Sequence, residues 1–209
     1  MIKQKADVNH AAELDGLSPL ILTVNEQHRQ LAMLLYEKKA DTGQADNLGW
    51  TPLMFAAQKG HDELVEWLLR QQANPSVIAQ DGATPLLVAC RSGQLDSAKF
   101  LLTHGADINE KNDVAGETPL TAALQEKQAA VARWLMDAGD GGVGCDIAIK
   151  NNSGQSPCDI ADENQMERLR DKIYIRMREL AEKKRRLREE EEKKARKAAA
   201  RKAALMNSS

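Results

Sequence analysis

The residues that could carry chemistry in this chain are few and scattered. The four histidines among 209 residues, His10, His28, His61 and His104, have no partner at the spacing of a metal site. The acidic residues form no pair suited to acid–base work, and the cysteines, Cys90, Cys145 and Cys158, include no Cys-x-x-Cys. The sequence also lacks phosphate-loop and nucleophile-elbow motifs. We therefore expect no enzyme activity, no cofactor and no metal.

The glycine-rich segment "GDGGVG" (139–144) has no strand before it and no helix opening on it, so it is interpreted as a loop insertion. Scattered cysteines and an N-terminus without an apolar leader favour a reducing compartment. No apolar run approaches the roughly 20 residues of a membrane span. The expected location is the cytoplasm, with the nucleus as the alternative, and no membrane contact is expected.

The charge is divided unevenly along the chain. Residues 164–209 hold 16 Lys and Arg against 8 Asp and Glu, a net charge of +8. The remainder holds 13 against 23, a net charge of −10. An acidic body with a basic tail indicates two surfaces that attract different partners.

An internal repeat supplies the elements that position these residues. The stretches "GLSPLILTVNEQ", "GWTPLMFAAQKG" and "GATPLLVACRSG" follow each other at 33-residue intervals, and the proline of a Ser/Thr-Pro pair recurs at Pro19, Pro52, Pro85, Pro119 and Pro157. Ser or Thr before Pro is a helix N-cap followed by Pro at the first helical position. Each unit therefore predicts a short apolar helix, a tight turn and a second helix. One unit cannot bury its apolar face alone, so neighbouring units must stack.

The period, the Thr-Pro-Leu motif, Gly60-His61 and Gly105-Ala106-Asp107 together resemble the ankyrin-repeat family over residues 13 to about 173. The resemblance implies an all-α solenoid of helix-turn-helix units with β-hairpin loops over residues 1–163, with repeats starting near 13, 46, 79, 113 and 151. The C-terminal helix then covers residues 164–209. The family's usual His after Thr-Pro-Leu is replaced in all five units, by Ile21, Met54, Leu87, Thr121 and Asp159. This departure removes an inter-repeat hydrogen bond that is usual in the family.

The resemblance also implies a protein-binding surface on the hairpin tips and in the concave groove. Trp50 occupies a hairpin position where the other units carry different residue types, so no structural rule requires an aromatic residue there. We interpret Trp50 as a binding hot spot, the alternative being that it folds onto the neighbouring hairpin. The candidate protein-binding residues are Asn47, Leu48, Trp50, Gln58, Lys59, Asp81, Arg91, Glu117 and Gln125. Their mixed charge argues against nucleic acid on this surface.

Large apolar residues recur at one position of the second helices, namely Leu34, Trp67, Phe100 and Trp134. We expect this column to seal repeat against repeat, so that Trp67→Ala costs about 3–5 kcal/mol of stability. An aromatic binding stripe is the alternative.

The C-terminal segment predicts one long helix, because no Gly or Pro occurs between Gln165 and Leu205. Met166, Leu169, Ile173, Met177 and Leu180 share one face, which we expect to cap the solenoid, and a partial seven-residue spacing predicts weak self-association at most. The cluster Lys193, Lys194, Arg196, Lys197, Arg201 and Lys202 is either a solvated helix end or a site for a polyanion, such as an acidic protein surface or RNA.

From these observations we expect a non-enzymatic adaptor or structural subunit of a larger, multi-subunit assembly. Its solenoid would bind one protein, and its basic helix would reach a second component. The alternative is a nuclear regulatory ankyrin protein whose basic tail contacts nucleic acid.

Overall fold

The computed structural model describes residues 7–137 and 145–206, the side chains being described up to residue 196. The insertion expected around residues 139–144 lies outside the described residues. Within them the chain forms ten helices and no strand, which confirms the predicted all-α repeat class. The compact units are Met1–Arg170 and Asp171–Ser209. The helices are α1 (Pro19–Asn25), α2 (Arg29–Glu37), α3 (Pro52–Lys59), α4 (Asp62–Arg70), α5 (Pro85–Arg91), α6 (Leu95–Thr103), α7 (Pro119–Gln125), α8 (Ala129–Asp137), α9 (Pro157–Glu163) and α10 (Glu167–Met206).

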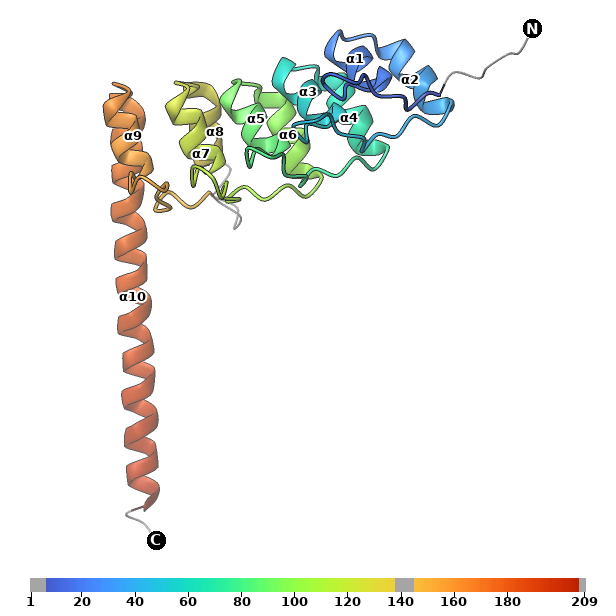
Figure 1. Cartoon of the computed structure of the whole chain (residues 1–209). Coiled ribbons are helices and arrows are strands. Elements are labelled where there is room, and N and C mark those ends of the chain that lie inside the picture. The colour runs from blue at the N-terminus through green and yellow to red at the C-terminus, as the bar shows by residue number, and fades with distance from the viewer. Residues whose placement is uncertain (1–6, 138–144, 207–209) are drawn as a thin grey trace, which may run out of the picture. The chain divides into compact units, whose positions relative to one another are not determined.

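Helix pairs stack in the first unit, as Figure 1 shows. The first helices of the pairs, α1, α3, α5, α7 and α9, each pack against the next, and α2, α4, α6 and α8 each cover their own partner. The first helices approach closely because small residues line their contacts. Ala56, Ala57, Ala89, Ala122 and Ala123 are completely buried. A core of alanine and branched aliphatics needs few aromatic residues.

The Ser/Thr-Pro motif builds each first helix as the sequence predicts. Pro lies in the first turn of all five, and the Ser18, Thr84, Thr118 and Ser156 side chains accept a hydrogen bond from a backbone N–H of that turn. Two kinds of residue, apolar and polar, replace the histidine that usually follows Thr-Pro-Leu. Ile21, Met54 and Leu87 are fully buried core residues, whereas Thr121 and Asp159 bond back to their own N-caps.

A ladder of hydrogen bonds at the helix turns joins the repeats. Nε2 of His61 donates to the carbonyl of Asn25 at 3.2 Å. One repeat later, Nε2 of Gln94 donates to the Gln58 carbonyl at 3.4 Å, and after another, Nε2 of Gln128 donates to the Arg91 carbonyl at 3.2 Å. These bonds satisfy carbonyls that the ends of the first helices leave without an intrahelical partner. Side chains from one register position thus connect four consecutive repeats, and we name this series the turn ladder.

A second ladder joins the hairpins. The side-chain amides of Asn47, Gln80, Asn112 and Asn152 each donate to a backbone carbonyl of the preceding hairpin, at 2.9 to 3.3 Å. Backbone N–H groups of Asn47, Gln80 and Asn152 add further bonds to the same hairpins. The hairpins are thereby held in register along one edge of the solenoid.

The apolar column of the second helices is only partly buried. Trp67, Phe100 and Trp134 are half-buried, and Leu34 is exposed. Trp67 nevertheless contacts Tyr36 of the preceding repeat edge to face, with ring centroids 5.6 Å apart. The column therefore does link repeats at Trp67, but the expectation of a sealed ladder is wrong at Leu34.

The long helix predicted for the tail is present as α10, which is continuous from Glu167 to Met206. Leu169 and Ile173 are buried, as predicted, whereas Met177 and Leu180 are exposed, so the prediction is wrong at Leu180. The exposed face carries pairs between residues four apart, including Arg178–Glu182 at 3.6 Å and Arg185–Glu189 at 3.7 Å. Such pairs support a solvated helix by a few tenths of a kcal/mol each.

Candidate protein-binding surface

The hairpin tips are rigid because polar side chains cap their turns. Carboxylate oxygens of Asp15 and Asp81 accept the backbone N–H two residues later, at 3.0 Å in both hairpins. Asp46 accepts two bonds, from the N–H groups of Leu48 and Trp50. An Asx turn of this kind fixes the loop before any partner arrives. Asp81 of the predicted set is therefore partly a structural residue, although it remains exposed.

Large apolar side chains project from four successive hairpins. Leu48, Ile78 and Val114 are 60 to 66% exposed, and Leu14 is 95% exposed. Turn residues are ordinarily polar, so one apolar side chain on each of four neighbouring hairpins is unusual. The ladder of amide bonds brings these hairpins side by side. We name Leu14, Leu48, Ile78 and Val114 the tip row.

Sequence reasoning found Leu48 but missed the other three members of the tip row. A signal was present at Leu14 and Val114, which stand beside acidic residues in predicted turns, whereas Ile78 lies between Val77 and Ala79 and gave no such signal. It could not be used because the three occupy different positions relative to the hairpin glycines, and only the fold brings them to one edge.

Acidic residues surround the tip row. The side chains of Glu13, Asp15, Asp81 and Asp113 are all exposed in the same hairpins. Apolar groups within a negative field favour a partner that presents apolar side chains flanked by Lys or Arg. The same field repels nucleic acid from this surface.

Trp50 does not project toward a partner, contrary to the main expectation. It is half-buried and packs against the core cluster that contains Met54, Ala79 and Ala83. Its ring also lies 5.5 Å from that of Phe55. Ala79 and Ala83 of the next hairpin have small side chains, which leave room for the indole to fold down. Trp50 therefore serves mainly the packing between the second and third repeats.

Asn47 is likewise occupied within the fold. Its side-chain amide donates to the Leu14 carbonyl at 3.2 Å, and its backbone N–H bonds to the Asp15 carbonyl. Substituting it would disturb the stacking of two hairpins, so its predicted role as a free contact residue is not supported by this geometry.

The predicted groove residues divide into free and paired side chains. Gln58 and Lys59 are exposed at the end of α3, and Gln125 is half-buried at the end of α7. Arg91 and Glu117, in contrast, form an ion pair between the third and fourth repeats, in which the Arg91 Nε lies 3.2 Å from a Glu117 carboxylate oxygen. The pair is partly shielded from solvent, so its charges neutralise each other more than they attract a ligand.

The titratable groups of the described residues show little sign of catalytic tuning. Burial, and to a lesser extent the neighbouring Asp107 charge, raises the pKa of Glu110. Glu110 Oε2 has no hydrogen-bond partner among the described residues. Burial also raises the pKa of the Cys90 thiol, and the nearby Cys145 adds to that effect. A buried, protonated thiol is a poor nucleophile, so Cys90 is a core residue.

Among residues 7–137 and 145–206, no group of three or more His, Cys, Asp or Glu side chains is arranged to hold a metal ion. No helix in the described part of the chain is long and apolar enough to cross a membrane.

The basic residues predicted to bind a polyanion lie on α10. Lys193, Lys194 and Arg196 are exposed, and Arg196 is 4.0 Å from Glu192 on the preceding turn. The side chains of Lys197, Arg201 and Lys202 lie outside the described residues.

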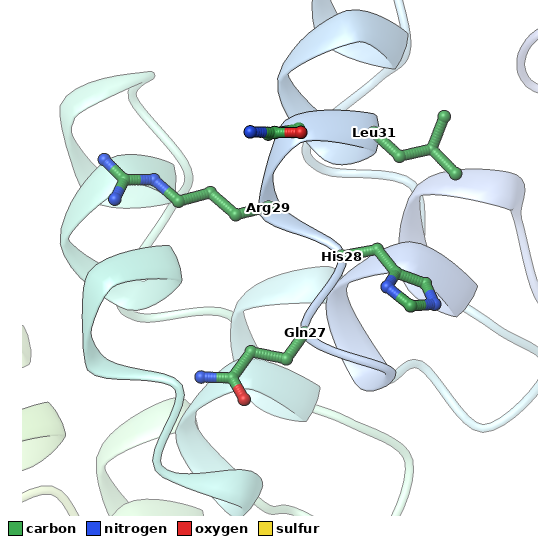
Figure 2. Close-up of a pocket in the computed structure, with 5 residues that line it drawn as sticks. Gln27, His28, Arg29 and Leu31 are labelled. Atoms are coloured by element: carbon green, nitrogen blue, oxygen red, sulfur yellow. The ribbon is translucent and has the colours of Figure 1, made fainter.

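Two surface recesses accompany these features. One lies at the turn between α1 and α2, has a volume of about 610 Å³ and is lined by residues 27 to 31. In Figure 2, Arg29 points toward the second repeat, whereas His28 and Leu31 point to the opposite side. The other recess, of about 570 Å³, is mostly apolar and lies between α6 and α8, with Leu102, Ile108 and Trp134 among its lining residues.

Comparison with known proteins identifies the family to which this architecture belongs. A profile of ankyrin repeats in three copies matches residues 1–79 and 71–151. A 61-residue stretch is 38% identical to the I-Kappa-B like protein H1 of Microplitis demolitor bracovirus (isolate Webb), covering 29% of this chain and 30% of that protein. The chain thus matches less than a third of the length of this relative. Ankyrin repeats are protein-interaction modules and are typically not enzymes. With its stacked helix pairs and projecting hairpins, the chain belongs to the ankyrin-repeat family.

Proposed function

We propose that this protein is a non-enzymatic adaptor that binds a protein partner along the tip row. The observation that carries the proposal is the exposure of Leu14, Leu48, Ile78 and Val114 on four neighbouring, rigid hairpins. Exposed apolar residues on a preorganised surface lose little conformational entropy on binding, so the area they bury contributes directly to affinity.

The acidic residues around the tip row define the chemistry of this partner. Glu13, Asp15, Asp81 and Asp113 are solvated carboxylates that would speed the approach of a basic protein surface without contributing much to its final affinity. Increasing ionic strength should therefore slow association more than it speeds dissociation. The exposed Gln58 and Lys59 at the neighbouring groove supply polar contacts at the rim.

The test replaces two members of the tip row at once, in the variant Leu48→Ser, Val114→Ser. Both side chains are exposed, so the fold should remain unchanged. Leu187→Ser, at a similarly exposed position on α10, is the matched control. We expect the double variant to retain less than about a tenth of the partner captured from a cell extract, as for the loss of a hot spot. Equal capture by all three proteins would refute the tip row as the binding surface.

A second contact is proposed for the basic end of α10. Residues 193–204 contain six cations and no acidic residue, and the described side chains Lys193 and Lys194 are exposed. An acidic protein surface is the partner we favour, in a multi-subunit assembly located in the cytoplasm. Duplex RNA is the competing ligand. The full chain and a chain ending at Arg188 should be titrated with an acidic peptide and with duplex RNA over a salt series, because each displaced counterion steepens the salt dependence.

The resemblance to a protein named I-Kappa-B like supports a regulatory alternative, in which the chain acts in the nucleus. Tight binding of the tail to RNA, lost on truncation at Arg188, would favour this alternative over the adaptor. Binding of the acidic peptide alone would favour the adaptor.

A further inference from the structure

One side of α10 is both apolar and basic. Lys183, Lys184 and Leu187 follow Leu180 by three, four and seven residues, so the four side chains lie together on the helix. Leu180 is 41% exposed and Leu187 is 52% exposed, and both lysines are exposed as well. We name Leu180, Lys183, Lys184 and Leu187 the basic face. An apolar stripe on a preformed helix is a common recognition element for protein surfaces.

The basic face and the tip row have complementary chemistry. Glu13 and Asp15 stand directly beside Leu14 of the tip row. Asp113 stands directly beside Val114, and all three carboxylates are exposed. One surface therefore presents apolar side chains with carboxylates, and the other presents apolar side chains with ammonium groups. The same division holds for the whole chain, since residues 164–209 carry a net charge of +8 and the remaining residues carry −10.

The two surfaces also share a spacing. The first helices of successive repeats pack against each other, and packed helix axes lie about 8–10 Å apart, so the hairpins follow at about that interval. Leu180 and Leu187 are seven residues apart on a helix that rises about 1.5 Å per residue, which separates them by about 10.5 Å along its axis. A helix lying across the hairpins can thus place one leucine on each of two neighbouring members of the tip row.

An extended peptide fits this spacing less well than a helix does. At about 3.3 Å per residue, an interval of about 10 Å is three residues, and side chains three residues apart on an extended chain point to opposite sides. Apolar residues seven apart on a helix stay on nearly the same side. The tip row therefore favours a helix that has apolar residues at a seven-residue spacing with Lys or Arg between them. The basic face of α10 has this pattern.

We propose that the tip row binds the basic face of a second copy of this chain. The inference rests on the proposed function of the tip row and names its partner. Leu180 and Leu187 of one copy would pack on the tip row of the other, while Lys183 and Lys184 would meet the carboxylates beside it. Each copy offers both surfaces, which allows either a reciprocal pair or a longer chain of copies. Two α10 helices joined through their basic faces are disfavoured, because the lysines of both copies would then lie together.

The test is an exchange of charges between the two surfaces of the full chain. The tail variant carries Lys183→Glu and Lys184→Glu. The tip variant carries Glu13→Lys and Asp113→Lys, which lie at the two ends of the tip row and, unlike Asp15 and Asp81, accept no bond that caps a hairpin turn. Self-association of each protein is measured by sedimentation over a concentration series, at low and at high salt. Circular dichroism verifies that each variant keeps its helices.

We expect the natural chain to self-associate, more weakly at high salt. Each variant alone should lose at least about tenfold in its association constant, because like charges then face each other. A mixture of the tip and tail variants should associate again, since the acidic α10 of one meets the basic tip row of the other. The matched control, Arg185→Glu with Arg186→Glu, makes the same change of charge on other sides of the helix and should weaken association by less than about threefold.

A natural chain that stays monomeric, or a mixture that does not associate, would overturn the inference. A tail variant that associates more strongly than the natural chain would also overturn it, by showing that two α10 helices pair directly. The proposed function fails separately. If Leu48→Ser with Val114→Ser abolishes capture of a different protein while the natural chain is monomeric, the tip row remains a binding surface and only its assignment to a second copy is wrong.

Discussion

Gly93 and Gln128 should be energetically coupled, although they belong to different repeats. Gly93 lies in the turn between α5 and α6, the two helices of the third repeat. Its φ is +76°, a left-handed conformation. A Cβ atom at this position would lie 2.5 Å from the Gln128 Oε1, which is far inside van der Waals contact. The Gln128 side chain is held there by its bond to the Arg91 carbonyl. Gly93→Ala must therefore both strain the backbone and displace a rung of the turn ladder.

Each of the two effects has a characteristic size. A left-handed alanine costs about 1 kcal/mol relative to glycine. Losing the Gln128 hydrogen bond costs about another 1 kcal/mol. We expect Gly93→Ala to lower the unfolding free energy by about 2 kcal/mol in the natural background. In a Gln128→Ala background, where the obstacle and the bond are both gone, the same change should cost only about 1 kcal/mol.

The assay is urea unfolding followed by circular dichroism, on the natural chain, both single variants and the double variant. Lys127 provides an internal control, because it holds the same turn position in the fourth repeat with a φ of +57°. The next repeat carries Met166 rather than Gln at the ladder position, so Lys127→Gly should only relieve backbone strain and stabilise by up to about 1 kcal/mol. If Gly93→Ala costs the same with and without Gln128, the reasoning about the ladder is refuted.

Three further outcomes are expected. Trp67→Ala should lower the unfolding free energy by about 2–3 kcal/mol, less than for a fully buried tryptophan, because Trp67 is half-buried. A double-mutant cycle with Tyr36→Ala should give a coupling free energy of about 1 kcal/mol between the two rings. A coupling of zero would contradict the edge-to-face contact. A chain ending at Arg188 should have the same melting temperature as the full chain. A chain ending at Asn164 lacks the buried Leu169 and should unfold at a lower temperature or aggregate. Identical melting of both truncated chains would show that the first turn of α10 adds nothing to stability. The raised pKa of Glu110 means that this carboxyl group holds its proton more tightly in the folded protein than in the unfolded chain. Protonation of Glu110 therefore stabilises the fold. This stability is fully present below the unfolded pKa and is lost as pH rises through the folded pKa. Glu110→Gln should therefore stabilise the protein at neutral pH and lose that advantage in acid, and a pH-independent difference between the two proteins would argue against it.

The sequence by itself determined the repeat architecture. Pro at a fixed position after Ser or Thr starts each first helix through local backbone and capping energies, which do not depend on distant contacts. The same local reasoning predicted α10, because a segment without Gly or Pro and rich in Ala, Glu, Lys and Arg has a high intrinsic helix propensity. A period of 33 or 34 residues then requires stacking, since no single helix pair buries its own apolar face.

The tertiary structure decided which side chains are exposed to solvent and which are buried. Trp50 was interpreted from its position as a projecting residue, but its fate depends on Ala79 and Ala83 in the next hairpin, whose small side chains let the indole pack down. Only the structure shows that Leu14, Ile78 and Val114 are exposed on hairpins that the amide ladder holds side by side. The sequence could not show this, because exposure depends on neighbours far along the chain. Leu31 and Leu64 occupy equivalent positions in their repeats, yet one is open and the other buried. Local sequence sets the conformation of a residue, whereas the packing of its neighbouring repeat sets its burial.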